Sequence, residues 1–248
     1  MKYSVEASPQ LYARAGGVLY LMLIVLGFFG QFVLNKPLVS GNAAATAANI
    51  MSTKSLWRFG IAAEFVALIC VITLAMIYFV LLKPVSREIN LLATFFRLIG
   101  IAVEAVTTLN LVAVLFPLGN SPSLKAFSPE QRYALATLAL KSHSHGYSLA
   151  LLFFGTCFLF HGYLIFSSGF LPKALGVLIQ IAGLCYLTNS FALFLTPDLA
   201  NRIFPAILLP AFVGEVSLCF WLLVKGVNVQ RWNERVGIQP SYRQAARA

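Results

Sequence analysis

The feature that most constrains this chain is a series of apolar segments, each about 20 residues long and nearly free of charge. A segment of this kind crosses a bilayer as an α-helix, because only helices and closed barrels pair every backbone polar group in lipid. The segments lack the strict alternation of barrel strands. We therefore predict an all-α integral membrane bundle of six transmembrane helices. The predicted spans run from Ala13 to Leu34, Trp57 to Leu82, Ile89 to Phe116, His145 to Phe166, Pro172 to Leu195 and Pro205 to Val224.

The composition agrees with a membrane protein and argues against binding to nucleic acid. Hydrophobic residues make up 59% of the chain and only 10% of residues are charged, whereas soluble domains carry about 25%. The formal net charge is +10, but the cations lie in loops and tails beside the apolar segments and form no nucleic-acid motif. We expect them to contact the lipid bilayer at its anionic headgroups, and we expect no nucleic-acid partner.

Two further segments carry helix signals but are too polar to span, so we predict two short interfacial helices. The first begins near Asn42 and continues through alanine, isoleucine and methionine residues. The second runs from Pro129 to Lys141, where Ser128 and Gln131 have the spacing of a capping box.

The predicted organisation is an N-terminal segment 1–12, a six-helix transmembrane domain 13–227 and a basic tail 228–248. Lysine and arginine residues are more frequent near the helix ends that share a side with both termini, and the tail supplies half of this excess. The distribution therefore favours a cytoplasmic location for both termini.

A few ionisable side chains interrupt the apolar spans and supply the main indication of function. Arg97 and Glu104 lie in one span, about two helical turns apart, so both project from one side of the helix, roughly 10 Å apart along its axis. A charged group within a span costs about 3 kcal/mol on insertion scales. We therefore expect these side chains to face the interior of the bundle.

The depth of each polar residue in the bilayer can be estimated from its position along its span, at about 1.5 Å per residue across a core of about 30 Å. By this estimate, polar residues of several spans lie at similar depths. Glu64, Glu104, Asn189 and His145 are predicted in the outer half, Glu215 near the midplane, and Arg97 deeper, in the inner half. Two interpretations stay open. In the first, Arg97 pairs with Glu104 or Glu215 and only fixes helix packing.

In the second interpretation, the polar groups form an outward-facing pocket that binds or moves a small solute or a lipid headgroup. The candidate binding residues are Glu64, Arg97, Glu104, His145, Asn189 and Glu215. Two alternatives are a membrane-embedded hydrolase or lipid-modifying enzyme centred on His145, and a structural or regulatory membrane subunit.

The remaining signals for catalysis or cofactors are weak, so we favour a protein that is not an enzyme and has no metal and no cofactor. His143 and His145 lie on opposed sides of a regular helix, and His161 is roughly 24 Å beyond His145. One metal site therefore cannot hold all three. The four cysteines all fall in apolar segments without CxxC spacing and are predicted to be packing residues.

Several stretches give the chain a resemblance to a known family. They are YARAGGVLYLMLIVLG at 12–27, GNAAATAANI at 41–50, FRLIG at 96–100, HGYSLALLFFG at 145–155, GYLIFSSGFLPKALGVL at 162–178 and LLPAFVGEVSLCFWLLVKGV at 208–227. In order and spacing the chain resembles the bacterial membrane-protein family catalogued as domain of unknown function 4386.

The resemblance covers about Ala13 to Val227 and implies a multi-pass protein of the bacterial inner (plasma) membrane. It implies no activity, since the family is defined without one. Arg97, His145 and Glu215 lie within the family-like stretches. The family pattern often has an acidic residue where Asn189 stands, which argues against a carboxylate role at that position here.

Overall fold

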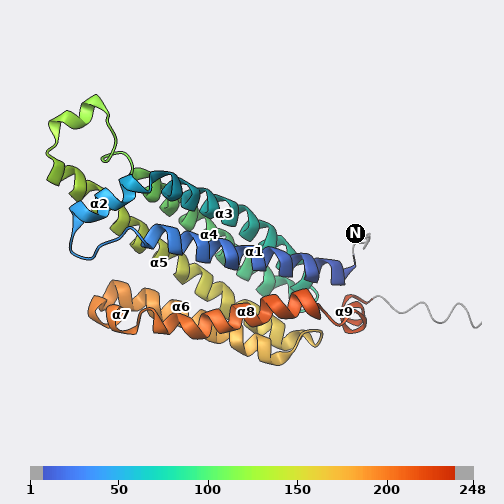
Figure 1. Cartoon of the computed structure of the whole chain (residues 1–248). Helices are drawn as coiled ribbons and strands as arrows, with labels where there is room; N and C mark the ends of the chain where they lie inside the picture. Colours follow the sequence, from blue (N-terminus) through green and yellow to red (C-terminus); the bar gives the residue numbers. More distant parts are fainter. Residues whose placement is uncertain (1–7, 238–248) are drawn as a thin grey trace, which may run out of the picture.

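A computed structural model describes residues 8–237 and forms a bundle of long helices (Figure 1). Six of the described helices are long and apolar enough to cross a membrane, which confirms the predicted all-α membrane fold. They are α1 (Pro9–Asn35), α3 (Lys54–Leu82), α4 (Arg87–Ala113), α5 (Pro129–Ser168), α6 (Lys173–Leu195) and the segment Ala206–Val224, most of which is α8 (Leu209–Val224). The short elements between and after them are α2 (Ala43–Ser52), η1 (Pro122–Ala126), α7 (Pro197–Ile203), η2 (Ala206–Leu208) and α9 (Val229–Val236).

The described chain starts and finishes at the same end of the bundle, as an even number of spans requires. In Figure 1, the start of α1 and the helix α9 lie at one end, and α2 and α7 lie at the other. We call these the α9 end and the α2 end. Gln10 ties the two termini together: its Nε2 donates to the carbonyl of Lys225 at 2.9 Å, and its Oε1 accepts from the backbone N–H of Val227 at 3.0 Å.

The surface of the bundle is apolar, as a lipid-facing surface must be. Large side chains such as Phe32, Ile69 and Val106 are about two-thirds exposed although they lie within the spans. A soluble fold would bury such residues, whereas in a bilayer they face hydrocarbon. Exposure of these side chains therefore marks the lipid-contacting face of each helix.

Helix α5 corrects one part of the sequence prediction. The predicted interfacial helix Pro129–Lys141 and the predicted span His145–Phe166 form one continuous helix of 40 residues. The predicted capping box is confirmed, since Ser128 accepts from the backbone N–H of Gln131 and the Gln131 side chain accepts from the N–H of Ser128. The helix therefore continues through the polar residues between the two predicted helices, and its backbone hydrogen bonds are not interrupted there.

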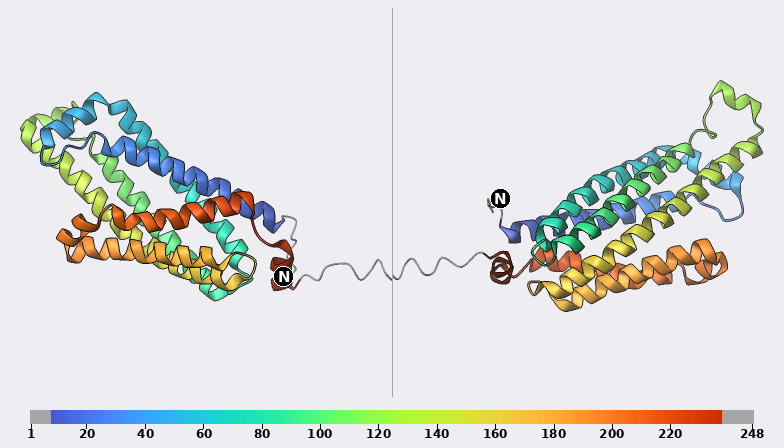
Figure 2. Two further views of the ribbon diagram at one scale, coloured as in Figure 1. Left: turned by 60° about the horizontal axis from the view of Figure 1, so that its bottom comes forward. Right: turned by 180° about the vertical axis from the view of Figure 1, so that it is seen from behind.

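A helix of this length is about 60 Å long, roughly twice the thickness of a hydrocarbon core. In Figures 1 and 2, the first turns of α5 and the loop that contains η1 project beyond the other helices at the α2 end. The first of the two predicted short helices is present as α2, which Asn42 caps by accepting from the N–H of Ala45 at 2.9 Å.

Paired glycines bring α5 and α6 into backbone contact. A Cβ atom built on Gly176 would lie 2.6 Å from the carbonyl oxygen of Gly162, and one built on Gly183 would lie 2.6 Å from that of Gly155. Two helices approach this closely in lipid only where the facing residues lack side chains. These two glycine contacts therefore fix the spacing of α5 and α6.

Two tryptophans, one at each end of the bundle, each donate a hydrogen bond to the last turn of a neighbouring helix. At the α2 end, the Nε1 of Trp57 donates to the carbonyl of Leu111 in α4 at 3.1 Å. At the α9 end, the Nε1 of Trp232 donates to the carbonyl of Leu81 in α3, also at 3.1 Å. Carbonyls in the last turns of a helix have no intrahelical partner, so each indole satisfies a group that the helix cannot.

Trp232 lies in the predicted tail, and part of that tail is helical and packed. Helix α9 begins after Asn228, whose side chain accepts from the N–H of Arg231 at 3.1 Å, and Trp232 is buried against the bundle. Residues 1–7 of the predicted N-terminal segment and 238–248 of the predicted tail lie outside the described residues.

Replacing Gly176 by alanine tests the contact between α5 and α6. We expect Gly176→Ala to lower the free energy of unfolding by about 1–3 kcal/mol, because its Cβ would overlap the α5 backbone. Gly27→Ala in α1 is the matched control. A Cβ there has no neighbour within 4 Å, so helix propensity alone should leave stability equal or slightly higher. Thermal unfolding of both variants in one detergent measures the difference, and equal melting temperatures would contradict the contact.

Candidate functional site

Glu215 is the carboxylate that the structure holds most firmly. Its Oε2 accepts a hydrogen bond from the Tyr20 hydroxyl of α1 at 2.9 Å, and its Oε1 accepts from the Tyr186 hydroxyl of α6. Hydrogen bonds to an ionised acceptor are stronger than those between neutral groups. Glu215 therefore links three spans, α1, α6 and α8, through one side chain.

Arg97 does not form the ion pair that one sequence interpretation expected. It is 3% exposed, and no carboxylate among the described residues lies close enough to pair with it. Its guanidinium carbon instead lies 5.2 Å from the ring centre of Tyr78 and 5.9 Å from that of Phe158. Contacts of a cation with aromatic faces offset part of the cost of its burial.

His161 completes the surroundings of Tyr78. Its ring centre lies 5.2 Å from that of Tyr78, and its Nδ1 lies 3.4 Å from the Sγ of Cys157, one turn earlier in α5. Tyr78 also meets Tyr20 edge to face at 6.5 Å. The Phe158 ring lies 5.7 Å from that of Tyr186, so these contacts form one connected group.

We call this group the aromatic cluster, and every one of the six spans contributes to it. Its members are Tyr20, Tyr78, Arg97, Phe158, His161, Tyr186 and Glu215. Counted along each helix from the α9 end, they lie at depths of about 6–20 Å. The cluster therefore occupies the half of the bundle nearer to α9.

Glu64 and Glu104 lie together at a different level, about 26 Å from the α9 end. Glu64 of α3 sits against Gly30 of α1, where a Cβ atom would overlap its carboxylate. Electrostatic interactions connect Glu104 with Glu64, and both with Tyr147 of α5. Neither carboxylate accepts a hydrogen bond from another described residue, and both are half-buried. We call Glu64 and Glu104 the carboxylate pair.

His145 and Asn189 are not brought into either group. His145 is exposed, its Nδ1 lies 2.9 Å from the carbonyl of Lys141 in its own helix, and its ring faces Phe194 at 6.2 Å. Asn189 is buried in α6, one turn beyond Tyr186, and its side chain forms no hydrogen bond with another described residue. The predicted binding set therefore divides into Arg97 with Glu215, Glu64 with Glu104, and two separate residues.

Two surface pockets lie at opposite ends of the bundle, and the predicted carboxylates line neither of them. One, of about 300 Å³, lies at the α2 end and includes Lys54 and Arg58. The other, of about 270 Å³, lies between α9 and the end of α5. Within residues 8–237, no group of three or more His, Cys, Asp or Glu side chains is arranged to hold a metal ion.

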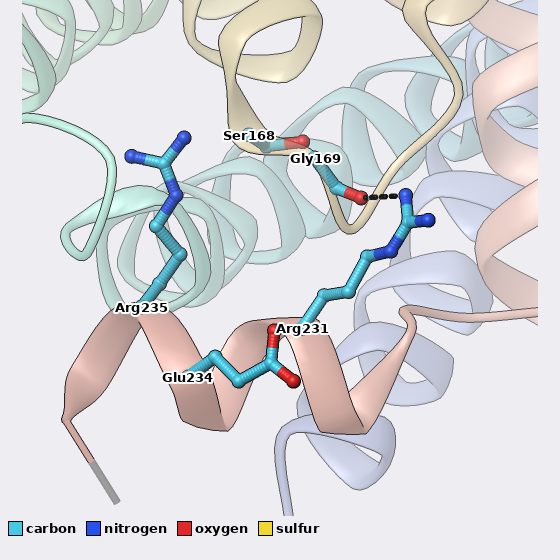
Figure 3. Close-up of a pocket in the computed structure, with 5 residues that line it drawn as sticks. All are labelled: Ser168, Gly169, Arg231, Glu234 and Arg235. Carbon is cyan, nitrogen blue, oxygen red and sulfur yellow. Dashed lines mark hydrogen bonds between the residues drawn. The ribbon is translucent and has the colours of Figure 1, made fainter.

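The pocket beside α9 shows how the end of α5 is capped (Figure 3). The Nη1 of Arg231 donates to the carbonyl of Gly169 at 2.9 Å, and the Nη2 of Arg235 donates to the carbonyl of Ser167 at 3.0 Å. Gly169 has a φ of +76°, the left-handed conformation that ends many helices. Arginine side chains near helix C-terminal carbonyls also favour the helix dipole.

Sequence reasoning missed the tyrosines and His161 as members of the site. Tyr20, Tyr78 and Tyr186 each place a hydroxyl well inside an apolar span, where a buried tyrosine usually needs a polar partner. That depth was the available signal. For His161, the signal was Cys157 four residues earlier, on the same face of α5.

Comparison with known proteins agrees with the resemblance found in the sequence. The family described as "Domain of unknown function (DUF4386)" matches residues 15–226. An "Uncharacterized protein" of Archaeoglobus fulgidus is 30% identical over 168 residues, which cover 68% of this chain and 84% of that protein. No solved structure matches the chain.

Removing the tyrosine hydroxyls tests how Glu215 is held. We expect Tyr186→Phe and Tyr20→Phe each to lower the free energy of unfolding by about 1.5–3 kcal/mol, because each removes a donor to a buried carboxylate. The double variant should lose less than the sum, since both hydroxyls serve one group. Tyr163→Phe, on the exposed face of α5, is the control. If all three single variants melt at the same temperature in detergent, Glu215 does not depend on these bonds.

Proposed function

Since this chain belongs to the DUF4386 family, a domain of unknown function, we propose its role from its own buried residues: it binds a small solute or lipid headgroup between its helices and moves it together with a proton. The observation that supports this proposal best is the carboxylate pair. Glu64 and Glu104 lie within spans without a hydrogen-bond partner among the described residues. Ionisable groups within a bilayer are costly, and they commonly mark the paths of ions, protons and substrates.

Glu215 extends this series of ionisable groups toward the α9 end. It lies about 14 Å from that end, whereas the carboxylate pair lies at about 26 Å. Tyr147 of α5 interacts electrostatically with Glu64, Glu104 and Glu215. A proton that moves between the level of the carboxylate pair and the level of Glu215 therefore starts and ends at a carboxylate, and the hydroxyl of Tyr147 interacts with both levels.

The two other interpretations receive less support. A hydrolase centred on His145 would need an acid, a metal or a nucleophile beside it, and its described contacts are with Lys141 and Phe194. In a structural or regulatory subunit, the charges would only organise packing. Glu215 and its two tyrosines fit that role, but a carboxylate pair that forms no hydrogen bond with another described residue adds little to packing.

The basic residues guide a proposal for location and partners. We place the α9 end in the cytoplasm and the protein in the inner (plasma) membrane of a bacterium. Lys173, Lys225 and Arg231 lie at this end, and Lys2, Arg243 and Arg247 of the predicted excess lie outside the described residues. Such cations suit the anionic headgroups of the cytoplasmic leaflet.

Neutralising the carboxylates tests proton-coupled movement. The full chain would be reconstituted in liposomes that contain a pH-sensitive dye, and proton flux would be measured on addition of inorganic phosphate, acetate or choline. We expect Glu64→Gln, Glu104→Gln and Glu215→Gln each to reduce flux at least tenfold, because an amide cannot carry a proton. Glu130→Gln, at the exposed first turn of α5, is the matched control and should keep wild-type flux.

Normal folding of the variants would be verified by their thermal unfolding. Folded carboxylate variants with wild-type flux would favour the structural interpretation instead. A wild-type protein with no flux for any of these solutes would contradict movement of this class of solute.

A further inference from the structure

Three neighbouring spans bury polar atoms that have no hydrogen-bond partner among the described residues. They include Nε and Nη1 of Arg97 in α4, the hydroxyl of Tyr78 in α3 and Nε2 of His161 in α5. None of them forms a hydrogen bond with a residue that the structure describes, and all three residues are at least 96% buried. Tyr78 neighbours both of the other residues: its ring centre lies 5.2 Å from the guanidinium carbon of Arg97 and 5.2 Å from the imidazole centre of His161.

This arrangement is unusual because buried polar groups in proteins nearly always have partners. Arginine cannot escape the cost by losing its proton, since its guanidinium stays charged in proteins. The faces of Tyr78 and Phe158 contact the guanidinium through their π-electrons, but its N–H groups still need an acceptor. The cost of leaving a charged donor unpaired is greatest in a site away from water.

The natural counter-charge is already engaged elsewhere. Glu215 belongs to the same cluster as Arg97, to which it is connected through Tyr186 and Phe158. However, the two oxygens of Glu215 accept from Tyr20 and Tyr186, and no ion pair to Arg97 is formed among the described residues. Arg97 therefore has no anionic partner bonded to it among residues 8–237.

The free groups are suited to donate hydrogen bonds. Arg97 offers three N–H groups, one on Nε and two on Nη1, and Tyr78 offers its hydroxyl. At His161, the thiol of Cys157 can donate to Nδ1, which leaves the ring proton on Nε2, the atom without a partner. Donors around a fixed positive charge match the oxygens of a carboxylate or a phosphate, and the arginine fork binds such groups in a bidentate manner.

We propose that Arg97, Tyr78 and His161 form a binding site for a small oxyanion, meaning a carboxylate or phosphate group. The site lies about 6–15 Å from the α9 end, by the positions of its residues along their helices. That this oxyanion is also the solute moved across the membrane rests on the proposed function. Its binding does not, and is tested separately. The same chemistry has two sources, a free anion or the headgroup of an anionic lipid.

Calorimetry on the purified full chain tests binding of free anions. Sodium phosphate and sodium acetate would be titrated at constant ionic strength, with sodium chloride as the reference. We expect the wild type to bind at least one of the two oxyanions, and Tyr78→Phe to bind it about tenfold more weakly, because one hydrogen bond to a charged ligand is lost. Arg97→Lys should weaken binding further, since lysine keeps the charge but lacks the fork.

Tyr78→Phe separates a binding role from a structural one. Its hydroxyl has no partner within the described chain, so its removal should leave the melting temperature of the anion-free protein equal or higher. Tyr163→Phe, which removes a hydroxyl from an exposed position of α5, should leave binding unchanged. If Arg97→Lys does not fold, the comparison of oxyanion binding by Tyr78→Phe and Tyr163→Phe still shows whether the Tyr78 hydroxyl takes part in binding.

A second arm identifies the source of the anion. The wild type and Tyr78→Phe would be placed in nanodiscs of phosphatidylcholine with or without phosphatidylglycerol. Stabilisation by phosphatidylglycerol that Tyr78→Phe reduces, without binding of free phosphate or acetate, assigns the site to a lipid headgroup. Binding of neither free anion nor phosphatidylglycerol, or equal binding by wild type and Tyr78→Phe, would overturn the proposal.

The test also separates this site from the carboxylate pair. Glu104→Gln should abolish proton flux while the oxyanion still binds, because Glu104 lies at the other level of the bundle. If the wild type binds the oxyanion but shows no proton flux, the proposed movement is contradicted and the binding site is not. If it shows flux but binds no oxyanion, the binding site is contradicted and the movement is not.

Discussion

The whole structure depends on one constraint: a polar group placed inside a bilayer must find its partner within the protein. The ends of the bundle meet this constraint with side chains that reach across to a neighbouring helix. Trp57 bonds a carbonyl near the end of α4, and Trp232 bonds one near the end of α3. In the middle of the bundle, Glu215 meets it with two tyrosine hydroxyls. Where the constraint is not met by the described residues, at Arg97, Tyr78 and His161, the molecule shows its best candidate for ligand chemistry.

Packing and chemistry are connected through α5 and α6. The contacts Gly155–Gly183 and Gly162–Gly176 hold the two backbones together. Phe158 lies between the two glycines of α5, and Tyr186 follows the glycine Gly183 of α6 by less than one turn. Because the backbones cannot separate, the rings of Phe158 and Tyr186 meet at 5.7 Å, and Tyr186 is aimed at Glu215. The small residues therefore position the aromatic cluster as well as the helices.

The sequence was sufficient to predict the six spans, the capping box at Ser128 and the burial of Arg97, because apolar length and cap spacing are local properties. It was not sufficient to place the site, because depth along a helix says nothing about rotation around its axis. Glu64 and Glu104 share a level and interact electrostatically, whereas His145, predicted in the same half, is exposed and contacts Lys141 and Phe194 instead. The continuity of α5 through a polar segment was missed because a polar stretch has two possible causes. It can mark the end of a helix, or it can belong to a continuous helix that reaches water.

Helix α9 connects the ends of two spans at one end of the bundle. Arg231 and Arg235 bond the last carbonyls of α5, and Trp232 bonds α3, so one short helix grips the ends of two spans. Those same two spans carry His161 and Tyr78, each within two turns of the gripped end. Detachment of α9 would leave three carbonyls, those of Ser167, Gly169 and Leu81, without their side-chain donors. The C-terminal segment therefore helps to satisfy the backbone polar groups at the ends of two spans.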